Sequence, residues 1–165
     1  MKMGIFFALT LILTGAASAS ESGNSSGVSP ALLFELNAWL DAETEYLERD
    51  RRPLIEFVGA ERGEDLHGVA DRSGGRTRGL YDAEIETIYL VEPWSPDNSR
   101  DISVLLHEMV HHRQSGQHWY CDQAQEWRAY QIQAQWLAEQ KIADDFYWPA
   151  VLLQSSCTKR DIHPE

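Results

Sequence analysis

The segment HEMVH at residues 107–111 is the feature that most limits how this chain can fold. It matches the pattern HExxH, in which two histidines stand four positions apart. On an α-helix these positions share one face, so both imidazoles can reach a single ion. Zinc accepts neutral imidazoles and leaves a position open for water, and the glutamate after the first histidine can take that water's proton. The pattern predicts a helix over about 100–115, with His107 and His111 as metal ligands and Glu108 as the general base.

A core helix without metal is the alternative interpretation of this segment. Apolar residues such as Val104, Leu105 and Leu106 precede the motif, so the helix is expected to be buried. Histidines in a buried helix are costly unless a partner satisfies them. This cost favours the metal site over a helix whose histidines happen to face solvent.

A catalytic zinc site needs a third protein ligand, and Glu126 is the preferred candidate. Glu126 lies one loop after the motif, near the start of a helix predicted over 123–142. A carboxylate on a second, antiparallel helix can face the histidine pair. His107, His111 and Glu126 would then form a His₂Glu site for Zn²⁺.

Two further histidines are weaker candidates for the third ligand. His112 points about a hundred degrees away from the ligand face of the helix. The metzincin pattern would require glycine and histidine at positions 114 and 117, where Gln114 and Gln117 stand, and His118 misses the register by one residue.

The sequence HEMVHH followed by EWRAY resembles the gluzincin branch of the zincin metallopeptidases, and also small exported bacterial families of unknown function. In that branch a glutamate on the helix after HExxH is the third zinc ligand. The resemblance covers about residues 80–137, and it implies that His107, His111 and Glu126 bind zinc while Glu108 acts as base. It also implies hydrolysis of a peptide or protein substrate.

The supporting residues of such a site are less clearly marked. In the larger gluzincins an aspartate four residues after the third ligand supports a ligand histidine, and this chain has Tyr130 there. Tyr130 and Asp122 are therefore candidates for that support, although Asp122 could equally cap the helix beginning at Gln123. For stabilising the oxyanion we expect Tyr120 or His118 ahead of Tyr130, because the loop after the HExxH helix could fold over the metal.

The remaining pattern predicts an α+β fold. It is expected to contain a small twisted sheet with a hairpin beside the HExxH helix, and the glutamate helix across from it. By the resemblance, the edge strand of the hairpin would hold extended substrate. The expected elements are a helix from Pro30 to about Arg52, a strand at 54–58, loops around a short strand near 66–70, hairpin strands at 79–81 and 86–91, and a helix over 144–153 that Pro149 kinks or delays.

The N-terminus has the pattern of a secretory signal peptide. Lys2 precedes an apolar run at residues 5–13, and Ala17-Ser18-Ala19 offers a cleavage site near Ala19. The run is shorter than the roughly 20 residues that span a membrane. We expect a signal peptide at 1–19, a flexible leader at 20–29, and a single zincin-like domain at 30–165 that is secreted or periplasmic, with no membrane span in the mature form.

Export bears on the two cysteines. An oxidising compartment favours a disulfide between Cys121 and Cys157, which would tie the C-terminal segment to the residues before Glu126. Two free buried thiols are the alternative.

The charge of the chain narrows its partners. A formal net charge of -12 argues against nucleic acid as a partner, because binding phosphates needs a basic surface.

Three functions compete as interpretations of the sequence. The first is an exported zinc metallopeptidase, the second is a non-catalytic zincin-fold module that binds a partner or holds a structural metal, and the third is a helical structural protein without metal.

Overall fold

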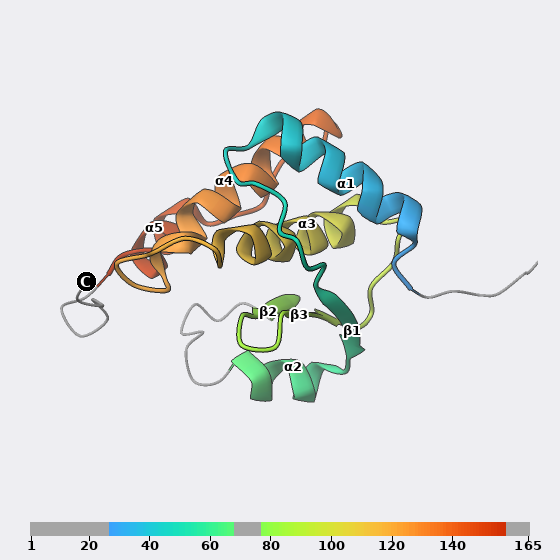
Figure 1. Cartoon of the computed structure of the whole chain (residues 1–165), viewed down its shortest axis with the longest axis horizontal. Coiled ribbons are helices and arrows are strands. Elements are labelled where there is room, and N and C mark those ends of the chain that lie inside the picture. The colour runs from blue at the N-terminus through green and yellow to red at the C-terminus, as the bar shows by residue number, and fades with distance from the viewer. Residues whose placement is uncertain (1–26, 68–76, 158–165) are drawn as a thin grey trace, which may run out of the picture.

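The computed structural model describes residues 27–67 and 77–157, and it has the mixed α+β architecture that the sequence predicts (Figure 1). The predicted signal peptide and residues 20–26 of the leader lie outside the described residues. The described elements are α1 (Pro30–Glu43), β1 (Leu54–Val58), α2 (Ala60–His67), β2 (Gly79–Asp82), β3 (Thr87–Val91), α3 (Ser99–Gln114), α4 (Ala124–Glu139) and α5 (Trp148–Gln154).

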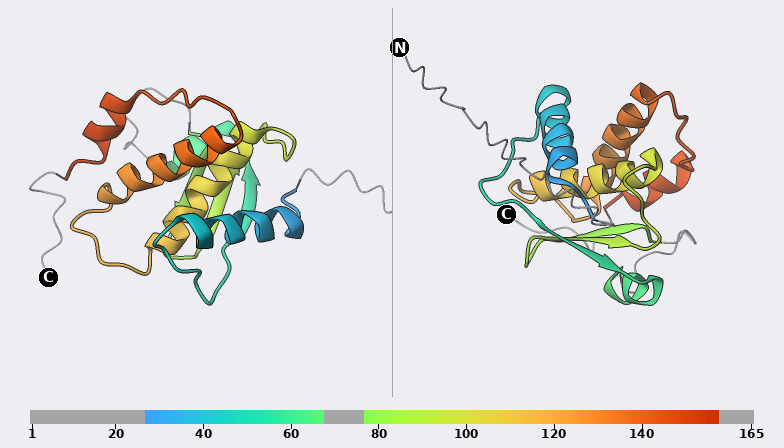
Figure 2. Two further views of the ribbon diagram at one scale, coloured as in Figure 1. Left: turned by 90° about the horizontal axis from the view of Figure 1, so that it is seen from above. Right: turned by 90° about the vertical axis from the view of Figure 1, so that its right-hand side faces the viewer.

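The three strands form one sheet in the order β1-β3-β2. β1 runs parallel to β3, and β2 pairs antiparallel with β3 to form the predicted hairpin. All five residues of β3 are buried, because helices cover both faces of the sheet. α3 lies on one face and α2 on the other, while α1 and α4 lie on the far side of α3 (Figures 1 and 2). This layering places α3 at the centre of the molecule.

The central helix α3 is fixed at its first turn and along its apolar face. The Asn98 side chain caps it by accepting from the Arg100 N–H at 3.0 Å. Leu105, Leu106 and Val110 are fully buried among the core residues of the sheet and of the neighbouring helices. A helix buried on so many sides has little freedom to shift, which suits it to hold a site.

The first helix is shorter than the sequence predicts. It ends at Glu43, and the Thr44 hydroxyl donates to the Leu40 carbonyl at 2.7 Å as the backbone becomes extended. The buried Arg113 guanidinium donates to the Tyr46 carbonyl at 2.8 Å and so holds the chain beyond the helix. The prediction of a helix to about Arg52 was wrong because this contact from a distant helix cannot be read from local periodicity.

The segment after β1 is a helix, where the sequence was expected to give loops and a short strand near 66–70. In α2 a Cβ at Gly63 would lie 2.7 Å from a methyl group of Val91, so the glycine lets the helix approach β3 closely. Glycine lowers helix propensity, which hid the helix from local reasoning. Residues 68–70 of the expected strand lie outside the described residues.

The two C-terminal helices are both present, and α4 begins within one residue of its predicted start. α4 stops at Glu139, where Lys141 has a positive φ of 61°. The Lys141 N–H donates to the Ala138 carbonyl and the Ile142 N–H to the Leu137 carbonyl, both at 2.9 Å, which is the Schellman arrangement. α5 starts late, at Trp148, because Pro149 suits only the first turn of a helix.

Candidate metal centre

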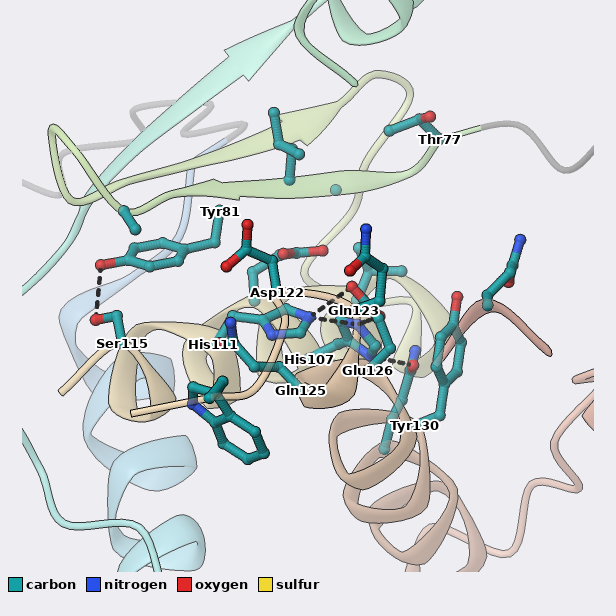
Figure 3. Close-up of a pocket in the computed structure, with 18 of the residues that line it drawn as sticks. Thr77, Tyr81, His107, His111, Ser115, Asp122, Gln123, Gln125, Glu126 and Tyr130 are labelled. Atoms are coloured by element: carbon teal, nitrogen blue, oxygen red, sulfur yellow. Dashed lines mark hydrogen bonds and ion pairs between the residues drawn. The ribbon is translucent and has the colours of Figure 1, made fainter. Parts of the chain in front are cut away.

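The three predicted ligands meet at one point. The Nε2 atoms of His107 and His111 are 3.0 Å apart, because residues four positions apart on α3 share a face. The Glu126 carboxylate reaches them from α4, at 3.3 Å from His107 and 3.4 Å from His111 (Figure 3). Three donor atoms about 2 Å from a tetrahedral metal ion lie roughly 3.3 Å from one another. Their spacing therefore fits a divalent metal ion.

The outer nitrogen of His107 contacts Gln133, another residue of α4. Its Nδ1 lies 3.0 Å from the Gln133 Oε1 atom. The amide nitrogen of Gln133 donates to the Ser103 hydroxyl at 3.0 Å, and this hydroxyl donates to the Arg100 carbonyl at 2.7 Å. These hydrogen bonds place the amide nitrogen of Gln133 toward Ser103 and its oxygen toward His107. The oxygen accepts from His107, so the proton of His107 is assigned to Nδ1.

The outer nitrogen of His111 is held in the same way. Its Nδ1 lies 3.0 Å from the Oε1 atom of Gln114, whose amide nitrogen donates to the Gln125 carbonyl at 3.2 Å. Both imidazoles thus donate outward from Nδ1, and both Nε2 lone pairs face the common point. Two lone pairs so close require a proton or a cation between them. Partners of this kind orient metal-binding histidines.

Burial and neighbouring charges act in opposite directions on the pKa values of the groups at this point. Burial lowers the pKa of His111, but the carboxylates of Glu126 and Glu108 outweigh burial and raise it to about 9. Burial raises the pKa of Glu126, while His111 and His107 hold it well below its ordinary value. The cluster therefore keeps one positive charge at its centre at neutral pH, the place where a metal ion would bind.

Glu108 lies beside this centre, on the side of the sheet. It is buried on α3, and strand β2 passes directly over it. A Cβ at Gly79 would lie 2.7 Å from the Glu108 Oε1 atom, so only glycine leaves room for this carboxylate. The predicted base is thus confined between β2 and the ligand helix.

Strand β2 is an edge of the described sheet, and alternate residues of β2 turn their backbone groups away from β3. The Val91 N–H donates to the Arg78 carbonyl at 2.9 Å. Hydrogen-bonded pairs alternate along antiparallel strands, so Leu80 bonds to β3 whereas the backbone groups of Gly79 and Tyr81 point the other way. An extended chain could pair with this edge.

His112 holds β2 against the ligand helix. Its Nε2 donates to the Arg51 carbonyl at 2.8 Å, so its Nδ1 accepts the hydrogen bond of the Tyr81 hydroxyl at 3.0 Å. Burial lowers the pKa of His112, which favours this neutral form. As predicted from its angle on the helix, His112 is directed away from the ligand cluster.

The cluster opens into a cleft of about 940 Å³ between β2, α3, α4 and the loop after α3. His118, Asp122 and Tyr130 line this cleft, as the ligands and Glu108 do. Tyr120 is 67% exposed and is not among the lining residues. The Tyr130 ring packs edge-on against His107, with ring centroids 4.6 Å apart. The Nδ1 contacts of the two imidazoles are made by Gln133 and Gln114, and the predicted support from Asp122 and Tyr130 stays a prediction.

The predicted disulfide between Cys121 and Cys157 is present. Its partners are 36 residues apart in sequence, and Cys121 is fully buried just before α4. The bond anchors the loop that leads into the helix of Glu126. It therefore limits how far Glu126, the predicted third ligand, can move.

Sequence reasoning missed Gln114 and Gln133, although a signal for each exists. Gln133 follows Glu126 by seven residues, so it lies on the same face of α4 two turns later. Gln114 follows His111 by three residues and shares its face of α3. A buried amide on the ligand face of a helix indicates a partner for an imidazole.

In the described residues no helix is both long and apolar enough to cross a membrane. No curated protein and no solved structure matches the chain. The model of the family described as Domain of unknown function (DUF6647) matches residues 25–165, most of the chain, and the chain therefore belongs to that family.

Proposed function

We propose that this protein is an exported zinc metallopeptidase, with His107, His111 and Glu126 as ligands and Glu108 as base. The observation that carries the proposal is the convergence of two Nε2 atoms and a carboxylate within 3.0–3.4 Å, with both Nδ1 atoms already bonded outward. Two histidines and a glutamate are a known donor set of catalytic zinc. Export is supported by the pattern at residues 1–19 and by the disulfide, since such bonds persist in oxidising compartments.

Each protein group has a defined task in peptide hydrolysis. Zinc at this centre would supply Lewis acidity and make water nucleophilic near neutral pH. The oxygen of the attacking water forms a bond to the carbonyl carbon, and Glu108 accepts a proton from this water. The π electrons of the carbonyl bond move to the carbonyl oxygen. The carbon–nitrogen bond then breaks, and the leaving nitrogen takes the proton from Glu108. The edge of β2 that is unpaired within the described residues would hold the substrate extended above α3.

Metal content and peptide cleavage test this proposal together. Metal would be measured by plasma mass spectrometry on the mature protein and on Glu126→Ala. We expect about one zinc per chain in the parent and a marked loss in the variant. Glu139→Gln removes another carboxylate from α4 and serves as the matched control, which should keep its zinc. Glu108→Gln should keep zinc but lose cleavage of a broad peptide library.

Other outcomes point to other functions. A protein that binds zinc stoichiometrically but leaves every peptide intact would be a binding or structural module. Absence of metal from both the parent and Glu126→Ala, even after incubation with zinc, would make HEMVH a coincidence on a core helix. Zinc retained in Glu126→Ala would reject Glu126 as the third ligand.

A further inference from the structure

We infer that Tyr130 is a catalytic residue whose phenolic hydroxyl donates a hydrogen bond to the oxyanion of the tetrahedral intermediate. This inference rests on the proposed peptidase function. Zincin chemistry needs a hydrogen-bond donor where negative charge develops on the former carbonyl oxygen. Tyr130 lies on α4, lines the cleft and packs against the ring of His107.

The position of Tyr130 follows from α4. It comes four residues after Glu126, so the two side chains share a face of the helix. Figure 3 shows its side chain rising from α4 beside the ligand cluster, with the hydroxyl toward the cleft below β2. The predicted third ligand and the phenol are therefore positioned by adjacent turns of one helix.

The ring of Tyr130 is held by neighbours on two sides. It packs edge-on against His107, with centroids 4.6 Å apart, and against Phe146, with centroids 5.0 Å apart. Phe146 lies in the segment before α5, and its own ring also contacts the ring of Trp148. A donor fixed in advance needs no reorganisation when charge develops, and this is the property required for oxyanion stabilisation.

Glu108 and Tyr130 approach the centre from different walls of the cleft. Glu108 lies under β2, against Gly79, whereas Tyr130 comes from α4. A substrate along β2 would then have its attacking water near Glu108 and its carbonyl oxygen toward α4. The phenol donates a hydrogen bond to this carbonyl oxygen while the water oxygen bonds to the carbonyl carbon. The proton of the phenol stays on Tyr130.

The other candidate donors are placed less favourably. Tyr120 is 67% exposed and does not line the cleft. His118 lines the cleft, but it is exposed on the loop between α3 and α4. In the part of the chain that the structure describes, neither residue has ring contacts like the two that hold Tyr130.

The test compares Tyr130→Phe with the parent on the peptide that the parent cleaves best. Phenylalanine keeps the ring that packs on His107 and removes only the hydroxyl. We expect kcat to fall about 100-fold or more, as on removal of other oxyanion donors, with KM changed less than about threefold and zinc content unchanged. Tyr120→Phe is the matched control and should behave as the parent.

Binding of a phosphonate peptide, which mimics the tetrahedral intermediate, gives a second readout. Tyr130→Phe should weaken phosphonate binding by about the same factor as kcat, while binding of the cleavage product stays unchanged. If the parent cleaves peptides, unchanged kcat and phosphonate affinity in Tyr130→Phe would overturn the role of Tyr130 alone. A zinc-loaded parent that cleaves no peptide would instead overturn the proposed function, and this role with it.

Discussion

Gly79 in β2 lies directly against the carboxylate of Glu108 in α3, so a Cβ at position 79 would be only 2.7 Å from Oε1. The same Cβ would lie 2.7 Å from a Val104 methyl group and 3.0 Å from the Glu108 Cγ atom. Two of these three contacts belong to the predicted base. The width of the cleft at this point is therefore set by the absence of a side chain from one strand residue.

Gly79→Ala is expected to displace Glu108 while leaving the three ligands in place. The added methyl group cannot fit unless the carboxylate, Val104 or β2 moves, and such overpacking costs about 1–3 kcal/mol. We expect kcat for peptide cleavage to fall about 10- to 100-fold, because a misplaced base transfers protons less well. Zinc content should be unchanged.

The matched control for this change is Gly59→Ala, since a Cβ at Gly59 meets nothing within 4 Å. Steady-state kinetics and metal analysis of both variants check the prediction. Normal kcat in Gly79→Ala would mean that the position of Glu108 does not limit the reaction.

Gln133→Leu is expected to weaken zinc binding about 10- to 100-fold. The change removes the acceptor that orients His107 and fixes its proton on Nδ1. Gln131→Leu makes the same substitution on α4 two residues earlier and should have little effect. Competition with a chelator of known affinity measures both variants. Equal zinc affinity for Gln133→Leu and the parent would contradict a role for this amide in the site.

The meeting of His107, His111 and Glu126 at one point could be predicted from the sequence because it depends on local helical geometry. His107 and His111 face one way on any straight helix, and Glu126 needed only a second helix to reach them. The end of α1 could not be predicted in this way. Arg113 fixes it from α3 through the Asp41 carboxylate at 2.6 Å and the carbonyl of Tyr46, contacts between residues about 70 positions apart.

The orientation of the supporting residues was also beyond local reasoning. Asp122 was a sensible candidate to support an imidazole, because carboxylates often do so. Yet the Nδ1 atoms of His107 and His111 contact Gln133 and Gln114, whose amide oxygens are placed there by the packing of α3 against α4. Which of several polar residues reaches an imidazole depends on the angle between two helices, which the sequence does not state.

Replacing both Cys121 and Cys157 by serine is expected to lower stability and to loosen the metal centre. In the chain-entropy model, a bridge between residues 36 positions apart contributes about 3–4 kcal/mol. Cys121 also anchors the loop before α4, so the loss should lower zinc affinity through Glu126. Thermal unfolding and zinc competition of the double variant, and of the reduced parent, check this. Unchanged zinc affinity would show that α4 is positioned without the bridge.

Stability should depend on pH differently with and without zinc. In the metal-free protein Glu126 and Glu108, outweighing burial, raise the pKa of His111 from 6.5 to about 9. A pKa that is higher in the folded state stabilises the fold fully below about pH 6.5, and this contribution is lost as pH rises through about 9. The melting temperature in the presence of a chelator should therefore fall between these values.

With zinc bound, the same groups give the opposite trend. Ligation requires neutral imidazoles, so zinc should be released as pH falls through the histidine range and retained toward pH 9. The difference in melting temperature between zinc-loaded and chelated protein should grow steadily from about pH 5 to 9. Glu126→Gln removes both the ligand carboxylate and the main charge that raises the pKa of His111, so its melting curves with zinc and with chelator should coincide. Parallel pH profiles of the parent with and without zinc would contradict the assignment of proton and metal to one shared position.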